Sequence, residues 1–234
     1  MPFFIIIFII VFFIVFILVF RNIRNAKLLR TVTKPYRGTH SERDLVLKLL
    51  KYGVPSQMIF HDLYVKKLNG EFSQIDLVVP TNVGIFVFEV KDYSGWIFGK
   101  GYQSHWTQVL AYGKIKYRFY NPIMQNSNHI KYLKSQLNQF ENIPFYSIVV
   151  FYGDCVLKNI SFVPNGTFLV KSENVLQEME YIVKNNNMAP YTNRREILKI
   201  LKIAVENGED IENQIQHSKN IQDMLWKNND KLYN

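Results

Sequence analysis

Hydrophobic residues in this chain follow three patterns: one unbroken run, several alternating segments and several helical repeats. The unbroken run extends from Phe3 to Phe20 and contains only Phe, Ile, Val and Leu. Its length of about 18 residues is near the lower limit for a helix that crosses a bilayer. Basic residues do not precede the run but follow it, at positions 21, 24, 27 and 30. A signal peptide would carry a positive segment before the run and a small-residue cleavage pattern after it. We therefore expect an uncleaved anchor over residues 1–20, in the cell membrane with a single pass, its N-terminus outside and the remainder cytoplasmic.

Alternating segments rich in β-branched and aromatic residues predict strands in the middle of the chain. We expect strands at 58–68, 74–79, 85–91, 146–152 and 167–170, and a hairpin over 106–120 that turns near Gly113. The pair Asn69-Gly70 is a strong hairpin turn between the first two strands. Residues 92–101, with three glycines, are expected to form a loop or to continue a strand.

Helical patterns surround these strands. We expect helices from Ser41, as a capping residue, to about 52, from Pro122 through Gln139, from a Ser172 cap through about 185, and over 194–206. A last amphipathic segment carries Ile211, Ile215, Ile221 and Leu225, and Ile211, Ile215 and Leu225 form one stripe that suits a protein partner. The order of elements predicts an α/β (α+β) domain with a mixed central β-sheet flanked by helices. We divide the chain into a transmembrane anchor (1–20), a basic linker (21–37), a central domain (38–152) and a C-terminal extension of a strand plus helices (153–234).

Composition narrows the functional classes. The chain has 234 residues, is 48% hydrophobic and carries a net charge of +9, which suits a polyanionic partner. Part of that charge lies beside the anchor. The single cysteine, Cys155, excludes an intrachain disulfide, and the five histidines show no zinc-ligand spacing. The absence of a glycine-rich phosphate loop with lysine argues against an ATP-driven motor within this sequence.

The candidate chemistry lies on the two central strands. Glu89 and Lys91 are two residues apart on one expected strand, so their side chains share a face. A hairpin would bring Asp76 of the preceding strand to the same place. Two carboxylates can hold a hard divalent cation, and a neighbouring lysine can position water or stabilise charge on a phosphate. These three residues are the minimal set for metal-assisted phosphodiester hydrolysis.

Simpler interpretations remain open for each residue. Asp76 can be a solvent-facing acid on an amphipathic strand. Glu89 lies in an apolar segment where an unpaired charge is costly, so a buried ion pair with Lys91 or an arginine would also explain it. The aromatic and basic residues of 112–120 can form a nucleic-acid-binding ribbon, but we favour a half-exposed hairpin.

The ordered set of motifs resembles a known family. The matching pieces are Gly38-Thr39-His40-Ser41-Glu42, Gln74-Ile75-Asp76, Gly84 through Lys91 followed by Gly95, then Trp106, and Asn121-Pro122-Ile123-Met124-Gln125. Together they resemble the NERD, or nuclease-related, domain, and more broadly the PD-(D/E)xK nuclease superfamily. The resemblance implies a restriction-endonuclease-like core and a nuclease-like domain over 38–152.

The resemblance also implies roles for particular residues. Asp76, Glu89, Lys91 and Glu42 would be catalytic, and Asp76, Glu89 and the Val90 carbonyl would bind Mg²⁺ or Mn²⁺. Substrate contacts would come from Gln74, Gln125 and His129, although His129 stands where the superfamily more usually has tyrosine. The expected partner is a nucleic acid, DNA by preference. The alternative is a non-catalytic nucleic-acid-binding or protein-interaction module at the cytoplasmic face of the membrane.

Overall fold

The structure, a computed structural model, describes residues 2–137, 142–216 and 218–219. Its labelled α-helices are α1 (Pro2–Leu29), α2 (His40–Tyr52), α3 (Pro122–Gln136), α4 (Val175–Asn185) and α5 (Arg194–Asn207), and short 3-10 helices lie at Ser56–Met58 and Ala111–Gly113. Its strands are β1 (Phe60–Lys66), β2 (Phe72–Pro80), β3 (Ile85–Asp92), β4 (Gly95–Lys100), β5 (His105–Leu110), β6 (Ile115–Tyr120), β7 (Phe145–Tyr152), β8 (Cys155–Ser161) and β9 (Thr167–Lys171). The expected mixed α/β class is confirmed.

The larger sheet, sheet A, has the strand order β1-β2-β3-β7-β9. The first three strands are antiparallel, whereas β7 runs parallel to both β3 and β9. One face packs against α2 and α4 through residues such as Leu45 and Ile182. The other face packs against α3 and α5 through residues such as Leu133 and Leu201. The central strands β3 and β7 are mostly apolar because both faces are covered, so a charged side chain within them requires an explanation.

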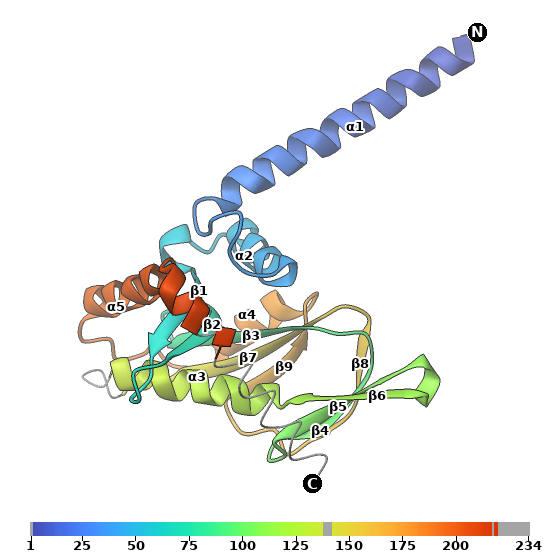
Figure 1. Ribbon diagram of the computed structural model, residues 1–234. Helices are drawn as coiled ribbons and strands as arrows, with labels where there is room; N and C mark the ends of the chain where they lie inside the picture. Colours follow the sequence, from blue (N-terminus) through green and yellow to red (C-terminus); the bar gives the residue numbers. More distant parts are fainter. Residues whose placement is uncertain (1, 138–141, 217, 220–234) are drawn as a thin grey trace.

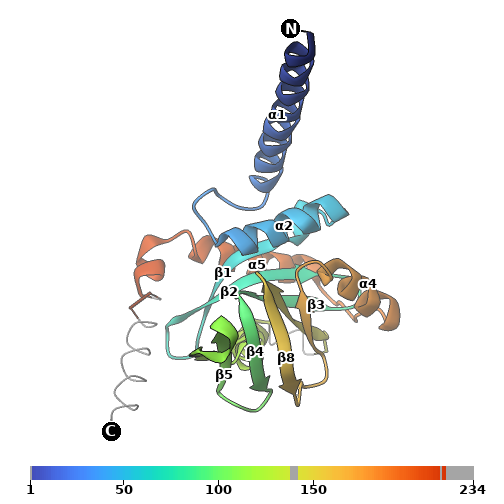
Figure 2. The same cartoon turned by 90° about the vertical axis from the view of Figure 1, so that its right-hand side faces the viewer.

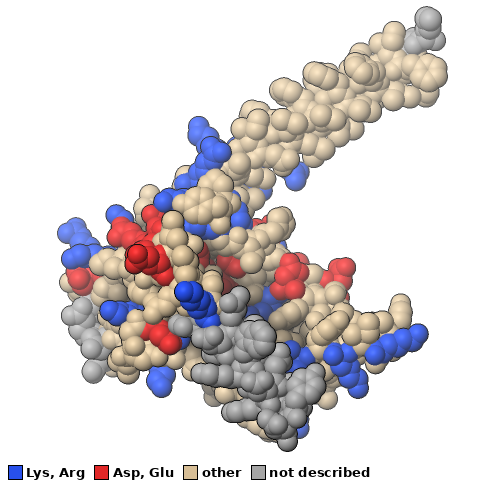
Figure 3. Space-filling view, viewed as in Figure 1, with Lys and Arg blue, Asp and Glu red and all other residues tan. Residues whose placement is uncertain are grey.

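The smaller sheet, sheet B, has the order β6-β5-β4-β8 and continues two strands of sheet A. The chain passes from β3 to β4 through Tyr93 and Ser94, and from β7 to β8 through Gly153 and Asp154. Both pairs, β3 with β7 and β4 with β8, are parallel. The β5–β6 hairpin projects from the body of the domain, and Figure 3 shows Lys and Arg side chains along it. Figure 2 views the molecule with β4 and β8 in front.

Helix α1 extends away from the domain (Figure 1). It is the one helix among the described residues that is long and apolar enough to cross a membrane, and an 18-residue window within it has a mean hydropathy of 3.8. Its apolar side chains are exposed from Phe3 to Phe20. The helix does not end at Phe20 but continues to Leu29, so the first part of the expected linker is helical.

Helix starts differ from the sequence prediction in two places. Thr39, rather than Ser41, caps α2: its hydroxyl accepts a hydrogen bond from the Glu42 N–H and donates one to Glu42 Oε1. This is the Thr-x-x-Glu capping box, whereas Ser41 lies inside the first turn and donates to Asp92 Oδ2. Helix α4 begins after Asn174 rather than at Ser172.

Other elements follow the prediction closely, with one omission. The hairpin turns at Asn69-Gly70 and near Gly113 are both present, and the buried strand at 146–152 is β7. Strand β8 was not predicted, because its sequence mixes exposed polar and apolar residues without regular alternation. Helix α3 ends at Gln136, with Leu137 as its C-cap, which is earlier than the predicted end at Gln139. Gln139 itself lies outside the described residues, as do Ile221 and Leu225 of the last amphipathic segment. The same segment's Ile211 and Ile215 are exposed.

The linker that follows α1 is fastened into the domain by Arg37. Its guanidinium Nε lies 2.7 Å from Asp62 Oδ2, and the two side chains are only 4% and 8% exposed. The same guanidinium donates to the backbone carbonyls of Asp62 and Val205, the latter in α5. Arg37 therefore ties together the linker, the edge strand β1 and the last described long helix.

We expect Arg37→Met to lower the free energy of unfolding by about 3–5 kcal/mol, because it leaves the buried Asp62 carboxylate without its cation. Urea unfolding of the full chain in detergent micelles measures this loss. Arg195→Met, on the exposed surface of α5, is the matched control and should change stability by less than about 0.5 kcal/mol. Equal stability of both variants would show that Asp62 is stabilised by other groups.

Candidate active site

The candidate carboxylates lie where β2 and β3 separate. The last pair of their ladder joins Leu77 to Phe88, and the same register continued by one residue places Asp76 beside Glu89. Beyond this pair, a side chain takes the place of a backbone acceptor: the backbone N–H of Val90 donates to Asp76 Oδ2 at 2.7 Å. The Val90 backbone therefore orients the Asp76 carboxylate, and the strand register brings the second carboxylate next to it.

Glu89 is the most buried charge of the site, with 1% of its side chain exposed. Lys91 Nζ lies 2.5 Å from Glu89 Oε1, and His129 Nε2 lies 3.2 Å from Glu89 Oε2. Burial by itself raises the pKa of Glu89, but the Lys91 charge and the His129 contact together lower that pKa below its usual value. Burial opposes the charge on Lys91, but Glu89 and Asp76 raise the pKa of Lys91 above its usual value. The pair is thus ionised, and the buried Glu89–Lys91 ion pair considered from the sequence is present.

Asp76 is electrostatically different from Glu89. Burial, followed by the negative charges of Glu89 and Glu42, raises the pKa of Asp76 well above its usual range. Lys91 and the Val90 N–H act in the opposite direction but do not compensate. Asp76 is therefore no ordinary solvent-facing acid. If Asp76, Glu89 and Glu42 were all ionised, their combined negative charge would exceed the single positive charge of Lys91.

Glu42 approaches from α2 with a histidine behind it. His61 Nε2 lies 3.4 Å from Glu42 Oε2, and His61 Nδ1 forms a hydrogen bond of 2.8 Å with the Thr33 hydroxyl. Burial raises the pKa of Glu42, but contacts with His61 and Thr39 outweigh burial and lower it. Gly38 is required here, since a Cβ on it would lie 2.4 Å from His61 Cε1 and 2.8 Å from Glu42 Oε2, and its φ is +71°.

A second histidine supports Glu89 in a similar way. His129 Nδ1 forms a hydrogen bond of 2.9 Å with the hydroxyl of Ser73, while its Nε2 faces Glu89. Gln125, one turn earlier on α3, accepts a hydrogen bond of 3.0 Å from Lys91 Nζ through its Oε1. Gln125 and His129 therefore both face the Glu89–Lys91 pair from one side of α3.

Gln74 lies in a different environment. Its amide Nε2 donates to Asp62 Oδ1 at 2.8 Å, so it belongs to the Arg37–Asp62 cluster. Of the residues expected at the site, the structure thus groups Asp76, Glu89, Lys91, Gln125 and His129, places Glu42 close enough to influence Asp76, and directs the Gln74 amide elsewhere.

The residues of this site fit a hard divalent cation in their chemistry. Glu42 Oε2 and Glu89 Oε2 are buried, each facing a histidine Nε2 at 3.4 and 3.2 Å, and Asp76 is held against an excess of negative charge. Carboxylate oxygens are preferred ligands of Mg²⁺. Within the described ranges, however, no three His, Cys, Asp or Glu side chains are close enough to one another to form a metal site. The donor set is suitable, but it is not gathered into a ready-made cluster.

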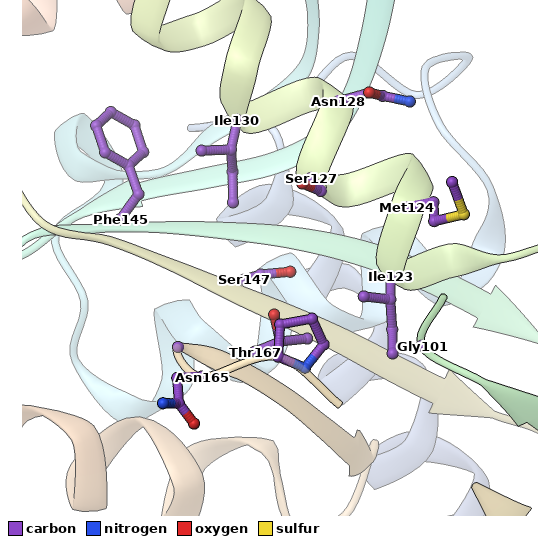
Figure 4. Close-up of a pocket in the computed structure, with 12 residues that line it drawn as sticks. Gly101, Ile123, Met124, Ser127, Asn128, Ile130, Phe145, Ser147, Asn165 and Thr167 are labelled. Atoms are coloured by element: carbon purple, nitrogen blue, oxygen red, sulfur yellow. The ribbon is translucent and has the colours of Figure 1, made fainter. Parts of the chain in front are cut away.

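A separate cavity of about 310 Å³ lies between α3 and the start of β7. Met124, Ser127 and Asn128 of α3 line it together with Phe145 and Ser147, and Figure 4 shows these side chains around the hollow. The lining residues do not include Asp76, Glu89 or Lys91. This cavity is therefore distinct from the candidate active site.

The sequence did not reveal the supporting roles of Thr33, His61 and Ser73. Each is polar and buried, but each is isolated among residues whose pattern indicates only a linker or a strand. A polar residue at an inward-facing strand position, such as His61 directly after Phe60, is the one available signal.

Comparison with known proteins agrees with the geometry. The family model of the nuclease-related domain matches residues 37–152. An uncharacterized protein of Bacillus anthracis is 32% identical over 126 residues, which amount to 54% of this chain and 58% of that protein. This chain thus spans less than two thirds of that relative. No solved structure gives a significant match. The matched segment contains the separated strands and the carboxylate site, and residues 37–152 of this chain belong to the nuclease-related domain family.

Proposed function

We propose that this protein is a membrane-anchored nuclease that hydrolyses phosphodiester bonds of nucleic acid, DNA by preference, with Mg²⁺ or Mn²⁺. One observation carries the proposal: Asp76, with its raised pKa, lies next to an ionised Glu89–Lys91 pair. Titratable groups that burial and like charges perturb in this way are concentrated at functional sites. The family match supports a nuclease-related role.

Each residue has a role in this proposal. Asp76 and Glu89, with the Val90 carbonyl, would hold the metal, which would supply Lewis-acid activation of the phosphate and of water. Lys91 would stabilise negative charge that develops on the phosphate. Gln125 would hold the Lys91 ammonium in place, because it already accepts a hydrogen bond from it at 3.0 Å. His129 would orient Glu89, whose Oε2 it faces at 3.2 Å, and Glu42 would add a further carboxylate near the metal.

The proposed location follows from α1. The apolar run would span the membrane, and the basic residues at its end would remain on the cytoplasmic side with the nuclease-related domain. Exposed Ile211 and Ile215 after α5 offer a small apolar stripe for a protein partner, which is compatible with the same arrangement.

A second function has its own supporting observation. Lys91 Nζ already occupies the position 2.5 Å from Glu89 Oε1, so the ion pair alone can account for both residues. In that case the domain would be a non-catalytic module that binds nucleic acid or a protein at the membrane. The two functions differ in one observable: only the nuclease would show metal-dependent cleavage of nucleic acid.

The deciding experiment incubates the full chain in detergent micelles with labelled single- and double-stranded DNA and RNA in Mg²⁺, Mn²⁺ or EDTA. We expect cleavage in metal, none in EDTA, and at least about 100-fold slower cleavage by Glu89→Gln. The exposed Glu180→Gln on α4 is the matched control and should cleave like the wild type. Cleavage that Glu89→Gln retains in full would contradict the proposed site, and a folded wild type that cleaves no substrate would favour the binding module.

A further inference from the structure

Sheet B carries only positive charge. Its strands contain Lys100, Lys116, Arg118 and Lys158 and no acidic residue. The surrounding sequence has the same bias, because no Asp or Glu occurs between Asp92 and Glu141. A strand surface with several cations and no acid attracts polyanions and has no local charge to repel them.

The strand register arranges this surface in rows. Directly paired residues share a face of a sheet, so one row runs from Arg118 on β6 through Thr107 and Phe98 to Asn159 on β8. The next row runs from Lys116 through Val109 and Trp96 to Val156. Each row therefore has a cation on the edge strand and an aromatic ring near the middle. Successive rows on one face are roughly 7 Å apart, from about 3.3 Å per strand residue.

The opposite face of sheet B is the one that packs on the domain. Trp106 and Phe119 lie on it, with ring centroids 6.3 Å apart, and Trp106 stacks on Phe151 of β7. Alternation along β6 thus turns Phe119 inward and Lys116 and Arg118 outward. The hairpin is not a uniform ribbon, since its cations lie on the outward face, away from the core.

The outward face is hollowed and accessible. A groove of about 480 Å³ crosses it, and its lining includes Phe98, Lys100, His105, Arg118 and Asn159. Lys100 and Arg118 are exposed. Lys158 Nζ lies 5.4 Å from the centroid of the Trp96 ring, so one face of that ring receives a cation from this side. The groove therefore combines cations that can bind phosphate, the amides of Gln103 and Asn159, and the half-buried ring of Phe98, with Trp96 on the next row of the same face.

We propose that this outward face of sheet B binds single-stranded nucleic acid, with phosphates along Lys116 and Arg118 and bases over Trp96 and Phe98. Bases can stack on side-chain rings only when they are not paired into a duplex, so the aromatic rows favour a single strand. A membrane surface is disfavoured, because Figures 1 and 2 place sheet B at the end of the molecule away from α1. The inference rests on the proposed nucleic-acid function and specifies its substrate class.

The test measures binding of fluorescent single-stranded DNA and RNA to the full chain in micelles, in EDTA so that no cleavage can occur. We expect Lys116→Gln/Arg118→Gln to weaken binding at least about tenfold and to reduce the slope of log K against log salt by about 1.4, or 0.7 per phosphate contact. Phe98→Leu should weaken binding by about fivefold or more without changing that slope. Lys199→Gln/Lys202→Gln on α5 removes the same charge from another surface and should bind like the wild type.

The outcomes separate this inference from the proposed catalysis. Loss of binding in the sheet B variants supports the inference even if the wild type cleaves nothing. Unchanged binding in both sheet B variants, with cleavage intact, would overturn it and leave the nuclease function standing. Duplex binding as tight as single-strand binding, insensitive to Phe98→Leu, would overturn the single-strand assignment. Binding of anionic vesicles in preference to oligonucleotides would assign the surface to lipid instead.

Discussion

Lys91→Met is expected to slow metal-dependent cleavage by at least about 100-fold, the typical effect of removing one group that stabilises charge in a transition state. Lys91 is placed for this role by its contacts with Glu89 Oε1 at 2.5 Å and Gln125 Oε1 at 3.0 Å. The neighbouring carboxylates raise its pKa, so the ammonium keeps its charge in spite of burial. Methionine preserves the length and packing of the side chain and removes only the cation.

The same substitution also affects stability, and a second variant separates the two effects. Without Lys91, the Glu89 carboxylate is buried with His129 as its remaining partner, so we expect a loss of up to about 3–5 kcal/mol in the free energy of unfolding. Glu89→Gln/Lys91→Met removes both charges and should regain much of that stability without regaining cleavage. Lys184→Met, at an exposed position of α4, controls for the loss of a lysine. Wild-type cleavage by a stable Lys91→Met variant would remove Lys91 from the mechanism.

Local patterns were sufficient to predict the core of the fold. Glu89 was conspicuous because a charged residue within an apolar strand needs a partner, and the alternation of strand residues fixed its relation to Lys91. The turn at Asn69-Gly70 and the buried strand β7 were equally local signals. Resemblance to the nuclease-related domain contributed the position of Gln125, whose contact with Lys91 no periodicity reveals.

Other features depend on distant parts of the chain. The hydrogen bonds from Ser73 to His129 and from Thr33 to His61 join residues 56 and 28 positions apart, so no short window contains both partners. Strand β8 exists because it pairs with β4, and its own sequence gives little indication of a strand. The cap at Thr39 is an exception, since the Thr-x-x-Glu spacing to Glu42 is a local signal, although the sequence prediction placed the cap at Ser41.

The contact of Thr33 with His61 also matters for experimental design. A soluble fragment that begins at Lys34 would remove the hydroxyl that holds the His61 ring behind Glu42. The anchor can be separated from the domain only upstream of Thr33. This link is further reason to assay the full chain in micelles first.

Asp76→Asn is expected to abolish metal-dependent cleavage and yet to raise the free energy of unfolding at neutral pH in EDTA. The raised pKa of Asp76 means that its ionised form is disfavoured in the folded protein by burial and by the charges of Glu89 and Glu42. Asparagine removes that charge, and its carbonyl oxygen can still accept the hydrogen bond from the Val90 N–H. A residue whose substitution stabilises the protein but eliminates its activity is retained for function and not for stability.

The pH dependence of stability gives an independent measure of the same effect. Because the folded-state pKa of Asp76 lies above its unfolded value of about 3.9, the folded state binds more protons, and this group's stabilising contribution is lost as pH rises through the raised pKa. Glu42 and Glu89 have lowered pKa values, so in the acid range they make the free energy of unfolding rise with pH, and they do so in both proteins. The difference in unfolding free energy between wild type and Asp76→Asn should therefore grow in favour of the variant as pH rises from about 4.

Metal should reverse the order of stability at neutral pH. A cation held by Asp76 and Glu89 offsets the excess negative charge, so Mg²⁺ at about 100 times its dissociation constant should stabilise the wild type by about 2.7 kcal/mol. Asp76→Asn should gain little, because it lacks one of the two carboxylates. Thermal unfolding of both proteins, each in EDTA and in Mg²⁺, gives the four unfolding midpoints to compare. If Asp76→Asn were less stable than the wild type in EDTA at every pH, Asp76 would be a structural residue that holds the Val90 N–H, and its ionised form would not destabilise the folded protein.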